Sequence, residues 1–373
     1  MSTRLAGPLL AAAAILAAAF APRQDSRAAF TVSAPSAVVR QGDINSTYIS
    51  YLDESRRYID APVTTFVRGG KRYWINSNAF ETALYAGSLE RPFQRLLWSR
   101  PTSEVISDPG RAGGAYWITN LYQADNGILA FVHTEFPRVE GRRYKSGRGR
   151  VGLAWSPDGE RFTYLGHIIR PFDDPSPRNV QGVPYLIKDG FFYIYYKDAC
   201  EGGNNAAARA PVRDVLAAAA ARRITAWRKY FRGAWASPGA GGPCTAIRIA
   251  DGIIHTDAAR STATGQYYFI TSRTNANGQD TWIKLHASSD GVTWRELGVI
   301  AREPASRVRG GYQYVSIVDA SGRDNASVGR QFYVYSAKDI TAPAVAIYRW
   351  TVDLGPDRSL RRVGARDAGT ALR

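Results

Sequence analysis

The sequence predicts an all-β fold built from five similar units. Aromatic residues make up 12% of the 373 residues, including 21 Tyr and 9 Trp, and such residues favour strands. A local pattern also recurs along the chain: a short strand, a turn containing Gly or Asn, and a strand dense in Tyr and Phe. Finally, the turns Asp158-Gly159 and Asp290-Gly291 each separate two strand-like stretches, which is typical of a β-hairpin.

The interval between the units fits one blade of a β-propeller. Equivalent aromatic positions in successive units are separated by about 58, 62, 75 and 65 residues. These positions are Tyr73, Phe131, Tyr193, Tyr268 and Tyr333. Four short strands per unit at this interval predict a five-bladed β-propeller. An irregular β-sandwich is the alternative.

The long third interval contains a predicted helix. From Pro211 to Phe231 apolar residues recur at helical spacing, with Pro211 near the first turn. We therefore expect a helical insertion between blades three and four, within residues 200–244. Cys200 and Cys244 bracket it, and in an oxidising compartment they are expected to form one disulfide. Two free thiols are the alternative.

The N-terminus is typical of an export signal. Arg4 precedes an Ala- and Leu-rich stretch that ends in small residues near Ala21, as in secretory signal peptides; a buried N-terminal helix is the alternative. An exported protein is therefore predicted, either periplasmic or secreted. No later segment is apolar for about 18 residues, so no integral membrane span is expected. The expected order is a signal peptide at 1–29, a linker or closing strand at 30–45, the propeller at 46–355 and a C-terminal tail at 356–373.

The charge of the chain bears on its partners. With 48 Lys and Arg against 32 Asp and Glu, the net charge is +16, which in an exported protein suits anionic polymers such as cell-wall glycans. The basic residues are scattered and no nucleic-acid-binding motif is present, so nucleic acid is not an expected partner.

A propeller brings distant residues together, because the first strand of every blade lines the central axis. Residues near these strand starts should therefore meet in one funnel. They are Asp60, Trp117 with Asn120, Gln181, His255 with Asp257, and Tyr314, joined by His133 and Glu135 from the second unit.

Two stretches resemble a known group of enzymes. Asp60-Ala61-Pro62, followed by the stretch from Gly69 to Trp74, resembles the first-blade motif of the five-bladed propeller glycosidases. These are the arabinanases, β-xylosidases and α-L-arabinofuranosidases, with the related invertase-like and neoagarobiose-hydrolase families. The stretch from Val180 to Tyr193 is similar to their third-blade motif. The resemblance implies that Asp60 activates water as a base, or attacks as the nucleophile of the invertase-like members.

The chain departs from this pattern at the general acid. Where the resemblance implies a Glu before Gly-Pro, the chain has Gln181 and an extra residue before Pro184, and an amide cannot serve as a proton donor at useful pH. Glycoside cleavage needs a second group to protonate the leaving oxygen. Glu135 and Asp257 are therefore the predicted catalytic partners of Asp60, with His133 and His255 as further candidates. The structural alternatives are a rim ion pair for Glu135 and a turn cap for Asp257.

Other funnel residues are suited to binding sugar. Aromatic rings stack on sugars and polar side chains bind hydroxyl groups, so the predicted substrate-binding set is Trp117, His133, Gln181, His255, Arg273 and Tyr314. No cofactor is required by this chemistry. The chain has four His without metal-ligand spacing, so no catalytic metal is expected. A structural Ca²⁺ or a water network held by His133 and His255, as in some relatives, is an open alternative.

These observations predict an exported glycoside hydrolase acting on a furanose- or galactose-containing oligo- or polysaccharide. The alternative is a non-catalytic glycan-binding propeller, which Gln181 favours. A third hypothesis is a sialidase-like enzyme, because the stretch from Ser288 to Trp294 resembles an Asp-box. Five units rather than six count against it.

Overall fold

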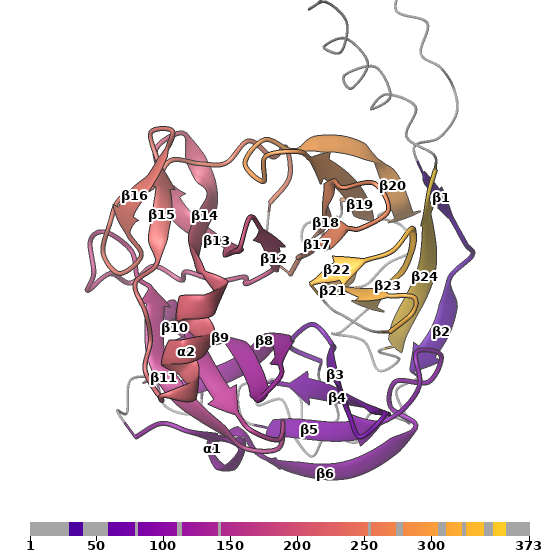
Figure 1. The fold of residues 1–373 in the computed structure, drawn as a ribbon, viewed down its shortest axis with the longest axis horizontal. Helices are drawn as coiled ribbons and strands as arrows, with labels where there is room; N and C mark the ends of the chain where they lie inside the picture. The colour runs from indigo at the N-terminus through magenta and orange to yellow at the C-terminus, as the bar shows by residue number, and fades with distance from the viewer. Residues whose placement is uncertain are drawn as a thin grey trace, which may run out of the picture.

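The computed structural model describes ten stretches of the chain, and its strands form five sheets. The described residues are 30–39, 59–78, 81–109, 114–140, 143–252, 255–273, 279–304, 311–322, 326–338 and 346–355. The predicted signal peptide at 1–29 and tail at 356–373 lie outside them. The sheets stand around one central axis (Figure 1), which confirms the five-bladed β-propeller.

Blades one and two are antiparallel meanders that run outward from the axis. Blade one comprises β3 (Thr64–Arg68), β4 (Lys71–Ser77), β5 (Glu81–Ala86) and β6 (Arg95–Pro101). Helix α1 (Thr102–Val105) leads into β7 (Ile106–Ser107), which joins the outer edge of blade two parallel to β11. The other strands of blade two are β8 (Ala115–Ala124), β9 (Gly127–Glu140), β10 (Arg143–Ser156) and β11 (Phe162–Ile169).

Blades three and four follow in the same order around the ring. Blade three comprises β12 (Tyr185–Lys188), β13 (Phe191–Cys200), β14 (Gly203–Pro211), β15 (Arg228–Phe231) and β16 (Ala234–Pro238). Blade four comprises β17 (Asp257–Ser261), β18 (Tyr267–Arg273), β19 (Thr281–Ser288) and β20 (Arg295–Glu303), with β22 (Ser327–Val328) parallel to β17.

Blade five joins the two ends of the described chain. Its inner strands are β21 (Tyr312–Asp319), β23 (Gln331–Lys338) and β24 (Ala346–Leu354). Strands β1 (Phe30–Val32) and β2 (Ser36–Val39) both pair with β24, so N-terminal residues cover the outer edge of the last blade (Figure 1). This pairing closes the ring.

The hydrophobic core is divided among the five interfaces between neighbouring blades, each filled by one cluster of buried side chains. Tyrosine hydroxyls at these interfaces bond to the next blade. Tyr185 donates to the carbonyl of Leu121 at 2.8 Å, Tyr195 to that of Gly291 at 2.9 Å, and Tyr335 to that of Leu89 at 2.6 Å. These three tyrosines therefore join neighbouring blades.

The helical insertion lies elsewhere than predicted. Helix α2 (Val212–Ala220) separates β14 from β15, so it is inside blade three and not between blades three and four. It ends at Ala220, well before the predicted limit of Phe231, because Arg222, with a φ of +58°, and Arg223 donate their backbone N–H groups to the carbonyls of Ala219 and Ala218, a Schellman-type cap. The chain after it pairs with β14 as β15.

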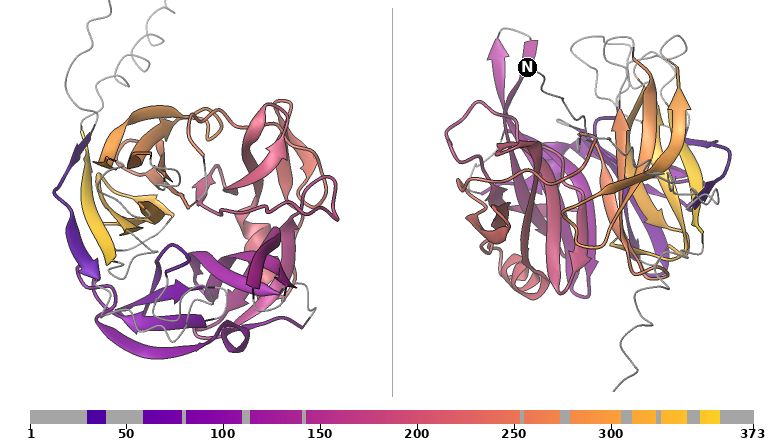
Figure 2. Two further views of the ribbon diagram at one scale, coloured as in Figure 1. Left: turned by 180° about the vertical axis from the view of Figure 1, so that it is seen from behind. Right: turned by 90° about the horizontal axis from the view of Figure 1, so that it is seen from above.

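Helix α2 packs against β9 and β10 and lies on one face of the ring, whereas the far ends of these two strands project from the opposite face (Figure 2). It follows Pro211, which pairs with Phe191 at one end of β13, whereas Lys197 near the other end bridges to Gln181. The expected disulfide between Cys200 and Cys244 is present, and its two cysteines bracket the helix in sequence.

The two Asp-Gly turns close hairpins, as predicted. In the first, Ser156 Oγ donates to Asp158 Oδ1 at 3.0 Å and accepts from the N–H of Gly159 at 2.7 Å. In the second, Ser288 Oγ donates to Asp290 Oδ1 at 2.9 Å and accepts from the N–H of Gly291 at 2.8 Å. The Asp-box-like stretch is thus a stabilised turn between β19 and β20. Among the described residues, no helix is both long and apolar enough to cross a membrane.

Candidate active site

Three blades meet at the carboxyl group of Asp60, just before β3. Trp117 on β8 donates its indole N–H to Asp60 Oδ2 at 2.7 Å, and Tyr314 on β21 donates its hydroxyl to Oδ1 at 2.6 Å. Trp117 and Tyr314 are buried, whereas Asp60 keeps partial exposure. The convergence expected of Asp60, Trp117 and Tyr314 is therefore present.

The environment of Asp60 raises the pKa of its carboxyl group toward neutral pH. Burial raises the pKa of Asp60 from 3.8 to about 6, the hydrogen bonds from Tyr314 and Trp117 lower it, and the nearby charge of Glu135 raises it further. The group is therefore ionised at neutral pH but can still accept a proton just below it. Such a carboxylate is suited to act as a base or a nucleophile.

Glu135 and His133 project from the same face of β9, two residues apart. His133 Nε2 lies 3.0 Å from Glu135 Oε1, and the His133 ring centre lies 5.2 Å from that of Trp117. Asn179, from the segment that enters blade three, donates its amide N–H to the same Oε1. Contacts therefore run without interruption from Asp60 through Trp117 and His133 to Glu135.

The fourth blade contributes His255, which faces Tyr314 with ring centres 4.2 Å apart. Burial lowers the pKa of His255 to about 4, and the nearby His133 lowers it further, so the ring is neutral at neutral pH. His255 and Tyr314 have φ values of +57° and +55°, a region that residues other than Gly rarely occupy. Backbone strain of this kind is common at functional sites.

Asp257 lies in a second layer, deeper along the axis. Its Oδ1 accepts from Asn120 Nδ2 at 2.9 Å and from the N–H of Ala258 at 2.9 Å, and its Oδ2 accepts from the N–H of Ile317 at 2.7 Å. Asn120 and Ile317 each follow a residue of the Asp60 layer by three positions, up to about 10 Å along a strand. Asp257 thus joins blades two, four and five beneath the Asp60 group.

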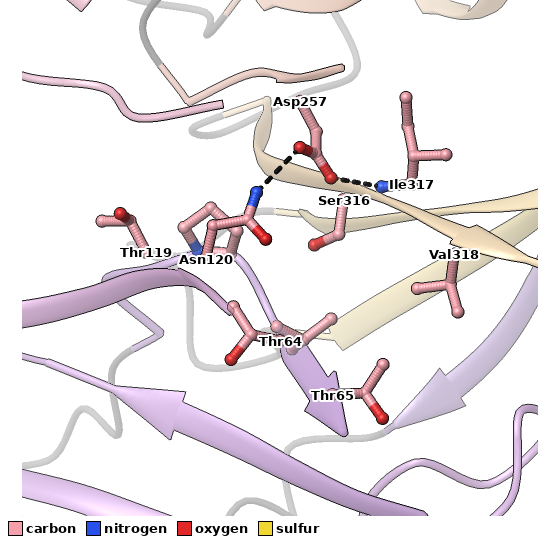
Figure 3. A pocket seen from close by; sticks show the side chains of 10 residues that line it. Thr64, Thr65, Thr119, Asn120, Asp257, Ser316, Ile317 and Val318 are labelled. Carbon is pink, nitrogen blue, oxygen red and sulfur yellow. Dashed lines mark hydrogen bonds between the residues drawn. The ribbon is translucent and has the colours of Figure 1, made fainter. Parts of the chain in front are cut away.

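Asp257 lines a small pocket with both polar and apolar walls (Figure 3). Burial raises the pKa of Asp257 to about 7, although its three hydrogen bonds lower it. The hydroxyls of Thr64 and Ser316 line the same pocket and have no hydrogen-bond partner within the described part of the chain. This pocket is the environment of Asp257, and its lining does not include Asp60 or Glu135.

Two predicted binding residues make other contacts. Gln181 accepts the N–H of Lys197 at its backbone carbonyl, 2.8 Å away, which ties the entry of blade three to β13. Arg273 donates to the carbonyl of Asp280 at 2.9 Å, and its guanidinium lies over the Trp282 ring at 5.5 Å.

Asn179 was missed by the sequence interpretation, although it precedes Gln181 by only two residues. It brings the third-blade motif into contact with Glu135. Its only sequence signal is its position just before that motif, because the connecting segment has no periodicity.

The structural Ca²⁺ considered from the sequence stays a prediction, and such an ion takes six to eight oxygen ligands. Both carboxylate oxygens of Asp257 face N–H donors, and His133 and His255 offer nitrogen. Across the described ranges, no group of three or more His, Cys, Asp or Glu side chains could hold a metal ion.

The fold and this axial group define a five-bladed propeller with two acidic side chains, Asp60 and Glu135, close together near its axis. One similar solved structure is the catalytic domain of the GH62 α-L-arabinofuranosidase of Coprinopsis cinerea, with 10% identity, 87% of this chain and 97% of that chain covered, and a TM-score of 0.52. Another is the α-L-arabinofuranosidase of Podospora anserina in complex with cellotriose, with 8% identity, coverages of 87% and 96%, and a TM-score of 0.52. At these identities the likeness concerns the fold. No protein-family model and no curated protein sequence matches the chain.

Proposed function

We propose that this protein is an exported glycoside hydrolase that cleaves a furanose- or galactose-containing glycan. The observation that carries the proposal is the axial group in which Asp60, held by Trp117 and Tyr314, lies close enough to Glu135 for the charge of one to shift the pKa of the other. Most glycoside hydrolases use two carboxyl groups that flank the glycosidic bond to be cleaved. The propeller fold shared with two arabinofuranosidases supports the same class.

In the proposed mechanism Asp60 acts as the ionised partner. With a pKa of about 6, it accepts a proton from water above that pH, or attacks the anomeric carbon directly. Its two donors hold the carboxylate in one orientation, because Trp117 occupies Oδ2 and Tyr314 occupies Oδ1.

Glu135 takes the role of proton donor that Gln181 cannot fill. It projects from blade two, yet Asn179 of the third-blade entry contacts it, so its carboxyl group lies beside the motif where the resemblance implies the acid. The mechanism needs no cofactor. Asp257 is assigned a structural role, because backbone and amide N–H groups engage both of its oxygens.

Export is part of the proposal and rests on two observations. The disulfide between Cys200 and Cys244 is typical of oxidising compartments, and the N-terminal sequence is typical of a signal peptide.

The test is a pair of carboxylate variants assayed on aryl glycosides with different leaving groups. Asp60→Asn should lose activity on every substrate. Glu135→Gln should lose activity on substrates with poor leaving groups but keep much of it with dinitrophenyl, which departs without protonation. The exposed Glu201, paired with Arg232, supplies the control variant Glu201→Gln. Wild-type activity that survives in both site variants would contradict the assignment.

A glycan-binding propeller without catalysis is the second candidate, favoured by Gln181 at the expected acid position. It predicts retention on an arabinan or galactan column with no release of sugar over long incubation. That outcome would replace the hydrolase proposal.

A further inference from the structure

The connection between blades two and three crosses the ring from its rim to its axis. This crossing segment, residues 170–184, begins at Arg170, whose N–H donates to the carbonyl of Gly239 at 3.1 Å. Near its inner end, Asn179 donates to Glu135, and the N–H of Val180 donates to the carbonyl of Gly149 at 3.1 Å. The segment therefore links the rim of blade three to the Glu135 carboxyl group.

A buried arginine holds the middle of the crossing segment. Arg150 on β10 is 2% exposed, and its guanidinium donates to the carbonyls of Arg178 at 3.0 Å and Ser176 at 3.1 Å and pairs with the carboxylate of Asp174. A buried charge is costly unless it is paired and hydrogen-bonded. Arg150 therefore fixes the backbone just before Asn179.

A second buried cation holds the outer end. Lys229 is fully buried on β15, and its ammonium group donates to the carbonyl of Arg170 at 2.8 Å and to Asp198 Oδ2 at 3.1 Å. Cys244 Sγ lies 3.8 Å from the same Asp198 oxygen. The disulfide region of blade three thus supports the start of the segment.

Two contacts of Glu135 share its Oε1 atom. Asn179 Nδ2 and His133 Nε2 both approach Oε1. His133 Nδ1 is buried with no hydrogen-bond partner in the described stretches, so the neutral ring is better placed with its hydrogen on Nε2, donating to Glu135. Two donors from different segments, the crossing segment and β9, therefore meet at Oε1.

We infer that the crossing segment is a positioning element for Glu135, in which Asn179 and His133 hold Oε1 and Arg150 keeps Asn179 in place. This inference rests on the proposed function, because it assigns the orientation of the acid proposed there. Asn179 and Arg150 are positioning residues and are not proposed to touch the reacting atoms.

Gly149 provides an independent means of disturbing the same contact. A methyl group at position 149 would collide with Asn179 Oδ1 and would lie 2.8 Å from His133 Cε1. Gly149→Ala should therefore displace both donors from Glu135 while Arg150 and the acid itself are retained.

The experiment compares Asn179→Ala, Gly149→Ala and Arg150→Lys with wild type over a range of pH. We expect kcat to fall about tenfold on a poor leaving group and far less on dinitrophenyl, with KM nearly unchanged. Loss of a donor to the carboxylate favours its protonated form, so the alkaline limb of kcat should move to higher pH. Matched controls are Asn205→Ala, which removes one amide bond to the Asp251 carbonyl at 2.9 Å, and Gly252→Ala, where nothing lies within 4 Å.

A ¹³C NMR titration of the Glu135 carboxyl group, assigned with Glu135→Gln, separates this inference from the proposed function. A wild type that hydrolyses no glycan refutes the function, yet a shift of the Glu135 titration to higher pH in Asn179→Ala would still support the contact. Unchanged titration and an unchanged alkaline limb in both Asn179→Ala and Gly149→Ala would overturn the inference. Those two variants carry the test even if Arg150→Lys fails to fold.

Discussion

Tyr314 donates a 2.6 Å hydrogen bond to Asp60 from a left-handed backbone conformation with a φ of +55°. The pairing of β21 with β23 shifts register between Gln313 and Ser316, so the strand departs from regular geometry where Tyr314 leaves it. A left-handed conformation costs a residue other than Gly about 1 kcal/mol or more. The strand tolerates this cost and places the hydroxyl at the carboxyl group of the neighbouring blade.

The first prediction concerns that hydroxyl. Tyr314→Phe removes a donor to the Asp60 carboxylate, so the pKa of Asp60 should rise above about 6. One hydrogen bond of about 1.4 kcal/mol corresponds to about one pH unit. If Asp60 must be ionised, the acid limb of kcat/KM should move up by about that amount, measured on a soluble aryl glycoside.

Tyr312→Phe is the matched control, since Tyr312 lies on the same strand and donates to Glu303 Oε1 at 3.0 Å. Its acid limb should coincide with that of wild type. An equal shift in both variants would assign the effect to β21 as a whole and not to the bond with Asp60.

The second prediction is that Asp60→Asn stabilises the fold while it abolishes activity. Because the folded pKa of about 6 exceeds the ordinary 3.8, ionisation favours the unfolded state, and wild-type stability falls as pH rises from about 4 to 6. Asn cannot ionise, and its amide can still accept from Trp117 and donate to Tyr314. The side chain is partly exposed, so we expect a gain of about 1–2 kcal/mol at pH 7.

Urea unfolding of wild type and Asp60→Asn at pH 4 and pH 7 measures this effect. The gain should be near zero at pH 4 and present at pH 7. Equal destabilisation of the variant at both pH values would contradict the prediction, because it would assign the effect on stability to the hydrogen bonds of Asp60 and not to its ionisation.

The site residues that could be predicted from the sequence are those at the starts of the inner strands. Asp60, Trp117 and Tyr314 meet because each lies at or near the start of an inner strand, which the repeat interval alone locates. Asn179 could not be placed in this way, because the crossing segment follows no period. The helix predicted from the sequence was too long, because Trp227 continues the helical spacing of apolar residues. In the structure the Trp227 side chain is buried in the core between blades two and three. Pairing of β15 with β14 overrides local propensity there.

The third prediction concerns the deeper layer. The pKa of Asp257, about 7 when folded, lies well above its ordinary 3.8, so the stability this group contributes is present below about pH 4 and lost as pH rises toward 7. For a buried group a shift of about three units corresponds to about 4 kcal/mol. Asp257→Asn should remove this part of the pH dependence.

Denaturant unfolding between pH 4 and 8 tests the Asp257 prediction, with Asp125→Asn as an exposed control. The stability difference between wild type and Asp257→Asn should change across this range, whereas that between wild type and Asp125→Asn should not. Parallel curves for wild type and Asp257→Asn would show that Asp257 keeps the same protonation state throughout.

The last prediction concerns the disulfide, which joins residues separated by 44 positions. Closing a loop of this length restricts the unfolded chain and stabilises the fold by about 4 kcal/mol. The double variant Cys200→Ser with Cys244→Ser should therefore lose roughly that free energy of unfolding. Because Cys244 lies beside Asp198, the partner of Lys229, kcat on poor leaving groups should also fall by a few-fold. Wild type treated with reductant, with free thiols counted by mass spectrometry, should behave like the double variant, and equal stability of reduced and oxidised protein would contradict the prediction.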